Sequence, residues 1–181
     1  GFIGLGAIGR ETAKICRGVG MTTLAFDPFL SREQIEAEGC IYRADYDEML
    51  AECDFVSIHV PLLPETRGMI GKKQLGVMKK SAVLINCARG GIVDEQALAD
   101  ALNSGTIAGA GIDVFEQEPP AKDNPLLGAK NLLCSPHSAA QTKEAVINMA
   151  LMCVEGCFTV LDGEKCLRVA DRSVYDHPKW R

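Results

Sequence analysis

Short apolar runs and stretches with helical spacing alternate along almost the whole sequence. The apolar runs have the length of strands and occupy residues 2–6, 22–27, 40–43, 54–60, 81–88, 107–115 and 131–135. Amphipathic stretches lie between most of them, as at 7–20, 45–52, 72–78 and 94–105. Strands joined through helices pair in parallel, and helices then cover both faces of the sheet. The alternation therefore predicts an α/β fold with a doubly wound parallel sheet.

Two of the predicted helices carry start and stop signals. Ser31 is followed three residues later by Gln34, which is the pattern of a capping box. Asp94 is placed to cap the start of another helix, and Gly105 lies just past the end of that helix. These signals support the helical part of the alternation.

Two helical stretches are unusually apolar. The first carries a stripe that Gly20 closes, formed by Ile8, Ile15, Cys16 and Val19. From about Thr142 to Leu161 one long helix is apolar nearly all round, and we expect it to be buried on several sides. Residues 162–181 lose this periodicity and are predicted to form an extended tail. We therefore expect a domain of residues 1–161 followed by a tail of residues 162–181.

A glycine motif joins the first predicted strand to the first predicted helix. Gly4, Gly6 and Gly9 form G-x-G-x-x-G, which permits a tight turn, close approach of a pyrophosphate and close packing of the helix. The next strand ends in Asp27, 18 residues after Gly9. Its carboxylate can accept hydrogen bonds from two ribose hydroxyls and repels a 2′-phosphate. The motif predicts a Rossmann-type fold that binds NAD, although Arg32 nearby leaves NADP open and S-adenosylmethionine sites have similar turns.

The composition limits the kinds of partner. The chain has 181 residues and a formal net charge of -5, without a long run of Lys or Arg. Nucleic acid and anionic membranes are therefore not expected as partners. No uninterrupted apolar stretch approaches the roughly 18 residues that a membrane span requires. Because the sequence opens inside its first predicted strand, we expect a fragment in which a signal peptide could not be seen.

Cysteines and histidines give no sign of a metal site. The eight cysteines form no C-x-x-C pair, and most lie in apolar runs. We expect small buried hydrophobic residues in a reducing cytoplasm. The three histidines, His59, His137 and His177, are far apart in the sequence and form no ligand motif. His59 is interpreted as a structural or cofactor-loop residue and His177 as a surface residue.

Polar side chains follow the last three predicted strands directly. Arg89 follows the fifth strand, Glu116 and Glu118 follow the sixth, and His137 follows the seventh. Ligands of open parallel sheets bind beyond the carboxyl ends of the strands. We therefore expect Arg89, Glu118 and His137 to gather at the cofactor, with Glu116 as a solvated loop carboxylate.

These three side chains together suit one reaction. A guanidinium binds a carboxylate bidentately and so orients an acid substrate. An imidazole exchanges a proton near neutral pH, and a neighbouring carboxylate fixes the ring and favours its protonated form. With a nicotinamide they predict oxidation of a hydroxyl next to a carboxylate. His137 would take the hydroxyl proton while hydride leaves for the cofactor.

Five motifs resemble the nucleotide-binding domain of the D-isomer-specific 2-hydroxyacid dehydrogenases over roughly residues 1–161. They are "GLGAIG", "HVPLLPETRGMI", "INCARGGIVDEQAL", "GAGIDVFEQEPP" and "SPHSAAQT". By this resemblance Arg89 binds the substrate carboxylate, Glu118 pairs with the histidine, and His137 is the acid–base residue. Asp113 would hold the nicotinamide carboxamide. Further cofactor contacts that the resemblance implies are Ala7, Ile8, Val60, Pro61, Thr66, Cys87, Ala88, Ser138 and Ala139.

The resemblance also concerns the whole protein. "NCARGGIVDE" with "DVFEQEPP" is most similar to the branch of the family that oxidises D-3-phosphoglycerate in serine biosynthesis. The family implies NAD, a small 2-hydroxy or 2-oxo acid substrate and a homodimer. Its substrate domain combines an N-terminal segment, missing here, with the C-terminal tail. We therefore expect this chain to bind NAD but to turn over poorly.

Several alternatives stay open. Glyoxylate, hydroxypyruvate, lactate and phosphite are substrates of sister enzymes. A non-enzymatic NADH-sensing corepressor of the same family is a second class, and a methyltransferase-like domain is a third that the Arg, Glu and His set disfavours. Ala7 and Ala139 depart from the basic residue and the glycine that many family members carry.

Overall fold

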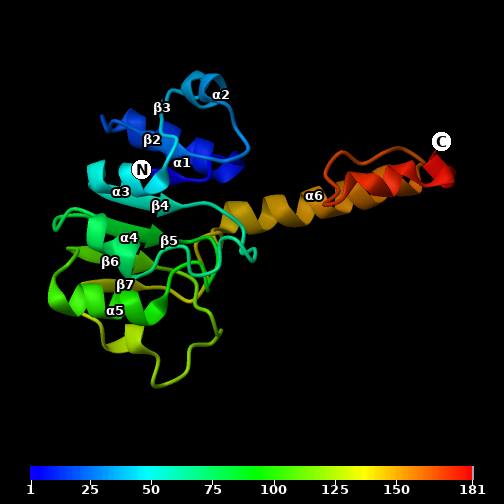
Figure 1. The fold of residues 1–181 in the computed structure, drawn as a ribbon. Helices are drawn as coiled ribbons and strands as arrows, with labels where there is room; N and C mark the ends of the chain where they lie inside the picture. Colours follow the sequence, from blue (N-terminus) through cyan, green and yellow to red (C-terminus); the bar gives the residue numbers. More distant parts are fainter. Residues whose placement is uncertain (181) are drawn as a thin grey trace. The chain divides into compact units, whose positions relative to one another are not determined.

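The computed structural model describes residues 1–180 and divides the chain into two compact units, Gly1–His137 and Ser138–Arg181. The first unit contains a seven-stranded sheet with the order β3-β2-β1-β4-β5-β6-β7 (Figure 1). All neighbouring strands pair in parallel. The strands are β1 (Phe2–Ile3), β2 (Leu24–Phe26), β3 (Ile41–Tyr42), β4 (Phe55–Ile58), β5 (Val83–Asn86), β6 (Gly109–Ile112) and β7 (Leu132–Cys134). The predicted doubly wound parallel sheet is confirmed.

Helices connect these strands and cover the sheet. They are α1 (Ala7–Gly18), α2 (Arg32–Ala37), α3 (Tyr46–Glu52), α4 (Lys72–Val77) and α5 (Glu95–Ser104), and a 3₁₀ turn, η1 (Pro125–Gly128), precedes β7. The strand order runs outward from β1 in one direction and from β4 in the other. Right-handed crossovers in opposite directions place helices on opposite faces. The direction of the strand order changes between β1 and β4, and ligands of such sheets bind at this point.

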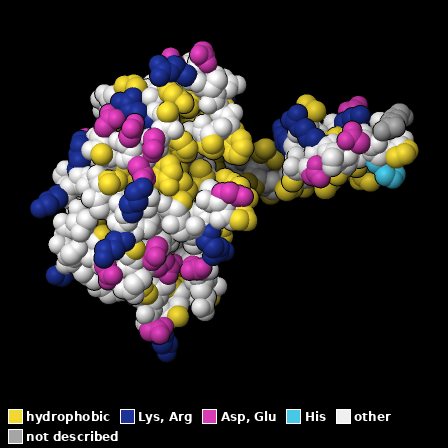
Figure 2. All heavy atoms as spheres, viewed as in Figure 1, with side chains coloured by type: hydrophobic (Ala, Val, Ile, Leu, Met, Phe, Trp, Pro, Cys, Tyr) yellow, Lys and Arg dark blue, Asp and Glu magenta, His cyan; other side chains and the backbone are white. Residues whose placement is uncertain are grey.

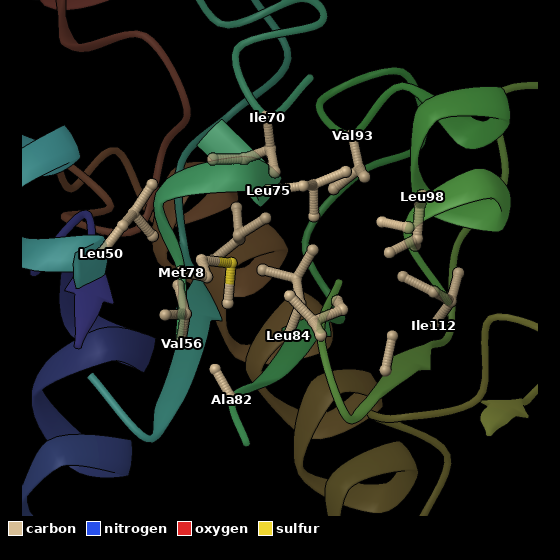
Figure 3. Close-up of a cluster of buried hydrophobic side chains, with 14 of the residues drawn as sticks. Leu50, Val56, Ile70, Leu75, Met78, Ala82, Leu84, Val93, Leu98 and Ile112 are labelled. Carbon is tan, nitrogen blue, oxygen red and sulfur yellow. The ribbon is translucent and has the colours of Figure 1, made fainter. Parts of the chain in front are cut away.

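Two buried clusters lie on the two faces of the sheet. Phe2 belongs to a smaller cluster with side chains of α1 and α2, whereas its neighbour Ile3 belongs to a larger one. The larger cluster joins α3, α4 and α5 to β4, β5 and β6. Figure 3 shows Val56, Leu84 and Ile112 of these strands among side chains of the covering helices. This packing anchors the carboxyl ends of the strands, from which the loops of the candidate site leave.

The opposite face of β4 to β7 is only partly covered. Phe55 pairs with Val83, Ile85 pairs with Gly111, and Gly111 pairs in turn with Leu133 along the same face. Phe55 is 49% exposed and Leu133 is 78% exposed. Figure 2 shows that hydrophobic side chains reach the surface of both units. The described residues therefore leave apolar surface on this side of the sheet.

Helix α1 turns its predicted apolar stripe outward. Its buried residues are Gly9 and Ala13. Ile8, Ile15 and Val19 are instead 74%, 67% and 72% exposed. The helix packs through its smallest residues because these allow the closest approach to the sheet.

The predicted helix signals are present in the structure. Ser31 and Gln34 form a capping box at the start of α2. The Asp94 carboxylate accepts a hydrogen bond from the Ala97 N–H at the start of α5, and Gly105 ends that helix with a φ of 72°. A positive φ favours glycine, so this residue type suits the position.

The second unit consists of a long helix and a folded tail. Helix α6 (Lys143–Leu161) is capped by Thr142 and is followed by 3₁₀ turns η2 (Arg172–Asp176) and η3 (Pro178–Trp180). No residue of α6 is buried, so the expected burial on several sides is wrong for the described residues. The tail is not extended either, since the Tyr175 hydroxyl donates to the Cys166 carbonyl at 2.7 Å.

Helix α6 bears on the expectation about membrane spans, although Asn148 and Glu155 interrupt its apolar residues. By length and composition alone it could cross a membrane, and it is the one such helix among residues 1–180. Its first two residues are Lys143 and Glu144, and Glu155 lies past its middle. One such helix is weak evidence for a span, because apolar helices of soluble proteins have the same length and composition.

The cysteines are less buried than predicted. All eight are free; Cys40 and Cys53 are buried, and Cys16 and Cys166 are partly exposed. The prediction of burial is wrong for the four exposed ones, which are Cys87, Cys134, Cys153 and Cys157. Two of these lie where strands end and two lie on α6, so neither location provides a covering layer.

Candidate active site

The glycine turn joins β1 to α1 with almost no spare room. A Cβ on Gly4, whose φ is +89°, would lie 2.8 Å from the His59 carbonyl oxygen. A Cβ on Gly9 would lie 2.6 Å from the Gly4 carbonyl oxygen. A Cβ on Gly6 would meet nothing within 4 Å. Packing therefore requires Gly4 and Gly9, whereas Gly6 borders open space.

That open space lies at the N-terminus of α1. Gly6 is the N-cap and has no side chain with which to bond the N–H groups of the first turn. Ala7 and Ile8, the first residues of the helix, are exposed. Unbonded first-turn N–H groups and the helix dipole attract phosphate. The turn thus fits the pyrophosphate of a dinucleotide.

Asp27 fixes the end of β2 to this turn. Its Oδ2 accepts from the Leu5 N–H at 2.8 Å, and its Oδ1 accepts from the Phe29 N–H at 2.9 Å. Each carboxylate oxygen has a further lone pair that ribose hydroxyls can use. The Arg32 guanidinium lies 5.1 Å from the centroid of the Tyr42 ring, in cation–π contact. The guanidinium of Arg32, which could otherwise bind the 2′-phosphate of NADP, is therefore in contact with Tyr42.

His59 and Val60 follow β4 and support the glycine turn. The His59 ring stacks on Phe2 with centroids 5.8 Å apart, and its Nε2 shares a hydrogen bond of 2.9 Å with the Ser57 hydroxyl. Burial lowers the pKa of His59, so this imidazole is neutral at pH 7. The Val60 Cγ1 would lie 2.9 Å from a Cβ on Gly4. The geometry suits a structural role for both residues.

The next part of this loop is closed by Thr66. Its hydroxyl donates to the Pro61 carbonyl at 2.7 Å and accepts from the Leu63 N–H at 2.8 Å. The loop is therefore shaped by its own hydrogen bonds. Contact of Thr66 and Pro61 with a cofactor stays a prediction.

Glu118 and His137 form a close pair. The Glu118 Oε2 lies 2.8 Å from the His137 Nδ1, and the Glu118 Oε1 accepts from the Phe115 N–H at 3.0 Å. These two hydrogen bonds lower the pKa of Glu118, the one from His137 most, so the carboxylate is ionised at neutral pH. The side chains of His137 and Glu118 are 50% and 36% exposed, so a ligand can reach the pair.

The backbone of His137 adopts an uncommon conformation. Its φ is +52°, in the left-handed region that residues other than glycine seldom occupy. The His137 N–H donates to the Asp113 carbonyl at 2.7 Å. The end of β6 therefore holds the backbone of His137, and Glu118 holds its ring. Such residues cluster at functional sites.

Asp113 links the ends of neighbouring strands. It is 2% exposed, and its Oδ1 accepts from the Ser135 hydroxyl at 2.5 Å. Burial raises the pKa of Cys87 after β5, and the charge of Asp113 raises it further. The ends of β5, β6 and β7 thus meet around Asp113, beside the backbone of His137.

Arg89 lies exposed in the turn after β5. Its Nη1 donates to the Ala88 carbonyl at 2.6 Å. A guanidinium carries five donors, so this bond uses one of them. Glu116, in contrast, forms an exposed ion pair with Arg67 at 2.8 Å.

A cavity of about 440 Å³ lies beside the Glu118–His137 pair. Its walls are mainly apolar and consist of Phe115, Glu118, Pro119, Pro120, Leu127, Cys134, Ser135, Pro136 and His137. This volume is within the range of pockets for small organic molecules, about 300–1,000 Å³. No group of three or more His, Cys, Asp or Glu side chains that could hold a metal ion occurs among the described residues.

The structure brings together part of the predicted site. The glycine turn meets Asp27 and Val60, and Glu118 meets His137 beside Asp113. Ser138 and Ala139 belong to the second unit, and their contact with the cofactor stays a prediction. Sequence reasoning missed Ser135 and Asn86, two small polar residues beside predicted site residues. Asn and Ser after strands commonly bond to nearby backbone, and this tendency could have identified them.

Known proteins resemble this chain along most of its length. The family model "D-isomer specific 2-hydroxyacid dehydrogenase, NAD binding domain" matches residues 1–139. A D-3-phosphoglycerate dehydrogenase of Archaeoglobus fulgidus is 45% identical over 163 residues, which cover 90% of this chain and 31% of that protein. A glyoxylate reductase of Korarchaeum cryptofilum is 44% identical over 164 residues, which cover 91% of this chain and 49% of that protein.

A solved structure agrees in fold. The D-isomer specific 2-hydroxyacid dehydrogenase of Lactobacillus delbrueckii ssp. bulgaricus, in its NAD complexed form, matches with a TM-score of 0.84 and 38% identity. The match covers 93% of this chain and 55% of that one. The chain thus spans about a third to about half of the length of these three relatives.

Proposed function

Because the chain belongs to the D-isomer specific 2-hydroxyacid dehydrogenase family, we propose that it forms the NAD-binding part of an enzyme that oxidises the hydroxyl of a D-2-hydroxy acid. The observation that carries this proposal is the Glu118–His137 pair beside the mainly apolar cavity. An imidazole held by an ionised carboxylate is a suitable acid–base group for a hydroxyl proton. We propose residues 1–161 as the extent of the NAD-binding domain.

NAD is the cofactor of this family's domain, and the residues of this chain fit it. The open space at Gly6 would admit the pyrophosphate, and Asp27, which is bonded to the glycine turn, would accept hydrogen bonds from the adenine ribose. When bound, NAD supplies the hydride acceptor. Buried Asp113 would accept a hydrogen bond from the carboxamide of the nicotinamide.

The chain's own residues would then orient the substrate and move its proton. The guanidinium of Arg89 would bind the substrate carboxylate through two parallel hydrogen bonds. Because the Nδ1 of His137 faces Glu118, its Nε2 would take the hydroxyl proton. The ionised Glu118 would stabilise the imidazolium that forms, and the reverse transfer would reduce a 2-oxo acid.

We propose D-3-phosphoglycerate as the substrate and serine biosynthesis as the pathway. The similarity to D-3-phosphoglycerate dehydrogenases supports this choice. The similarity to a glyoxylate reductase and to a hydroxypyruvate reductase keeps glyoxylate and hydroxypyruvate as alternatives to be tested.

We further propose a cytoplasmic homodimer. The nineteen-residue helix α6 has no buried residue, and its exposed apolar side chains include Val146, Ile147, Met149 and Phe158. An apolar surface of this kind is suited to association with a second copy. Light scattering of the purified protein should give twice the monomer mass. A monomer, or recovery only from membranes, would contradict the proposal.

Substrate screening tests the proposed reaction. The complete protein should be assayed with NAD and NADP against D-3-phosphoglycerate, D-lactate, glycolate, D-glycerate and phosphite. We expect the highest kcat/KM with D-3-phosphoglycerate and NAD. A higher value with glycolate or D-glycerate would replace the substrate but keep the reaction class. NADH binding without turnover of any of these compounds would contradict an enzymatic function.

The chain of 181 residues allows a second measurement. NADH fluorescence should show that the isolated chain binds the cofactor, because the glycine turn and Asp27 lie within it. Turnover by the isolated chain should stay far below that of the complete protein. Failure to bind NADH would contradict the assignment of the cofactor site itself.

A further inference from the structure

We infer that Asn86 and Gly90 are positioning residues that set Arg89 relative to the Glu118–His137 pair. Neither residue touches the substrate in this proposal; both act through the backbone of the turn 87–91. The inference rests on the proposed function, in which Arg89 binds the substrate carboxylate. It explains how the chain fixes the distance between Arg89, which would bind the substrate carboxylate, and the pair that would transfer the proton.

Both ends of the Asn86 side-chain amide are hydrogen-bonded to the backbone of this turn. It is the last residue of β5 and is 2% exposed. Its Nδ2 donates to the Arg89 carbonyl at 2.9 Å, and its Oδ1 accepts from the Ala88 N–H at 3.0 Å. A buried polar group that is hydrogen-bonded at both ends holds its neighbours rigidly. Asn86 therefore fixes the backbone immediately before and at Arg89.

Gly90 presses the same turn against the loop after β6. A Cβ on Gly90 would lie 1.9 Å from the carbonyl oxygen of Phe115 and 2.6 Å from the backbone nitrogen of Glu116. Both atoms belong to the backbone, so a side-chain rotation cannot make room. The contact requires glycine at this position because only glycine lacks the Cβ.

Phe115, whose carbonyl group Gly90 touches, also holds Glu118. The Phe115 N–H donates to the Glu118 Oε1 at 3.0 Å, and the Glu118 Oε2 faces His137. The Glu116 N–H donates to the Glu95 Oε1 of α5 at 2.7 Å, so this peptide is anchored on its other side as well. A continuous set of contacts therefore runs from Asn86 through Gly90 and Phe115 to the acid–base pair.

The two residues should consequently affect the reaction in different ways. Loosening Asn86 frees the Arg89 end of the set and leaves the Phe115–Glu118 hydrogen bond in place. Adding volume at Gly90 displaces Phe115 and with it Glu118. The first change should weaken substrate binding alone, and the second should also alter proton transfer.

Asn86→Asp tests the first effect in the complete protein. The carboxylate can still accept from the Ala88 N–H, but its second oxygen faces the Arg89 carbonyl without a proton to donate. We expect KM for the hydroxy acid to rise about tenfold, the scale of one unsatisfied buried acceptor. kcat should change less than KM, and the Kd of NADH and the pH profile of kcat/KM should stay as in the wild type.

Asn103→Asp is the matched control. Asn103 lies on α5, where its Oδ1 accepts from the Lys130 N–H at 3.1 Å. The substitution makes the same chemical change at an exposed side-chain-to-backbone bond outside the set of contacts. KM, kcat and the Kd of NADH should all remain within experimental error of the wild type.

Gly90→Ala tests the second effect. We expect both a higher KM and a shifted pH profile of kcat/KM, because the hydrogen bond between Phe115 and Glu118 is disturbed. If this variant does not fold, Asn86→Asp alone decides. An unchanged KM in Asn86→Asp, or a Kd of NADH that rises as much as KM, would overturn the inference.

Hydrogen exchange separates this inference from the proposed function. If the wild type oxidises no 2-hydroxy acid, the proposed function fails while the structural claim can still be measured. Asn86→Ala, which removes the acceptor of the Ala88 N–H, should then speed exchange of the Ala88 amide, while protection of the α5 amides stays unchanged. Equal exchange of the Ala88 amide in both proteins would overturn the inference on its own terms.

Discussion

The glycine turn and the Arg89 turn follow two strands of one sheet but are held in different ways. The glycine turn is fixed by volume, since a Cβ on Gly4 or Gly9 would overlap backbone atoms. The Arg89 turn is fixed both by the side chain of Asn86, which bonds to two backbone groups, and by the close packing of Gly90 against Phe115. The cofactor end of the site therefore tolerates no added atoms at Gly4 or Gly9, whereas the substrate end depends in addition on polar contacts that can be lost one at a time. Substitutions should distinguish the two ends.

The largest effect is expected from His137→Asn in the complete protein. Asparagine tolerates the positive φ of this position, so the backbone should remain in place while the acid–base group is lost. We expect kcat to fall by about 10²–10⁴, the usual contribution of such a group. The Kd of NADH should stay within about twofold, because the cofactor end is not touched. His177→Asn in the tail is the control and should retain full activity.

Steady-state kinetics and NADH fluorescence measure the two ends separately. Appreciable activity in His137→Asn would show that another group transfers the proton. A large loss of NADH affinity would show instead that the two ends are not independent.

Arg89→Lys should have the next largest effect. An ammonium cannot reproduce the forked contact with a carboxylate. Loss of a hydrogen bond to a charged group costs about 1.5–3 kcal/mol, which corresponds to a rise in KM of about 10- to 100-fold. Lys130→Arg on the surface is a control for exchange of the two cations. A wild-type KM in Arg89→Lys would assign carboxylate binding to another residue.

The fold was predictable because alternation and glycine spacing are local signals. Each strand was found from its own apolar run, and the start of α2 was found from Ser31 and Gln34. The outward orientation of the apolar stripe of α1 was not predictable, since Ile8 and Val19 have the sequence pattern of a packed face. The face of a helix that packs depends on how closely the helix approaches the sheet. Here α1 packs through the small residues Gly9 and Ala13, which allow the closest approach.

The candidate site was predictable only residue by residue. Strand ends indicated Glu118 and His137, but the sequence does not give the 2.8 Å contact between them. Gly90 escaped notice because the backbone group that it touches, at Phe115, belongs to a different strand connection, whereas the partners of Asn86 lie within its own turn. Contacts between loops depend on the register of the sheet, which a sequence pattern leaves open.

Gly9→Ala and Gly6→Ala should separate the packing of the glycine turn from its binding of the cofactor. The added methyl group at Gly9 overlaps the Gly4 carbonyl, and overpacking of this kind costs about 1–3 kcal/mol. Gly9→Ala should therefore lower Tm by several degrees as well as weaken NADH binding. Gly6→Ala should keep the wild-type Tm and lose NADH affinity alone, since its Cβ meets only the space for the pyrophosphate.

Gly18→Ala is the control for replacing a glycine by an alanine in this helix. Gly18 is the last residue of α1, and a Cβ there meets nothing within 4 Å. Its Tm should be equal to or slightly above that of the wild type, because alanine favours the helix. A lower Tm in Gly6→Ala than in Gly9→Ala would reverse the roles assigned to the two glycines.

The smallest expected effect concerns His59, which lies beside the volume-limited turn. Burial lowers its pKa below 6.5, so the unfolded chain takes up a proton at a higher pH than the folded chain. This histidine therefore reduces stability as the pH falls below about 6.5, and the loss levels off below its folded pKa. The decrease in Tm between pH 7.5 and pH 5.5 should be a few degrees smaller in His59→Gln than in the wild type. His177→Gln should keep the full decrease, and an equal decrease in His59→Gln would show that protonation of His59 does not destabilise the fold.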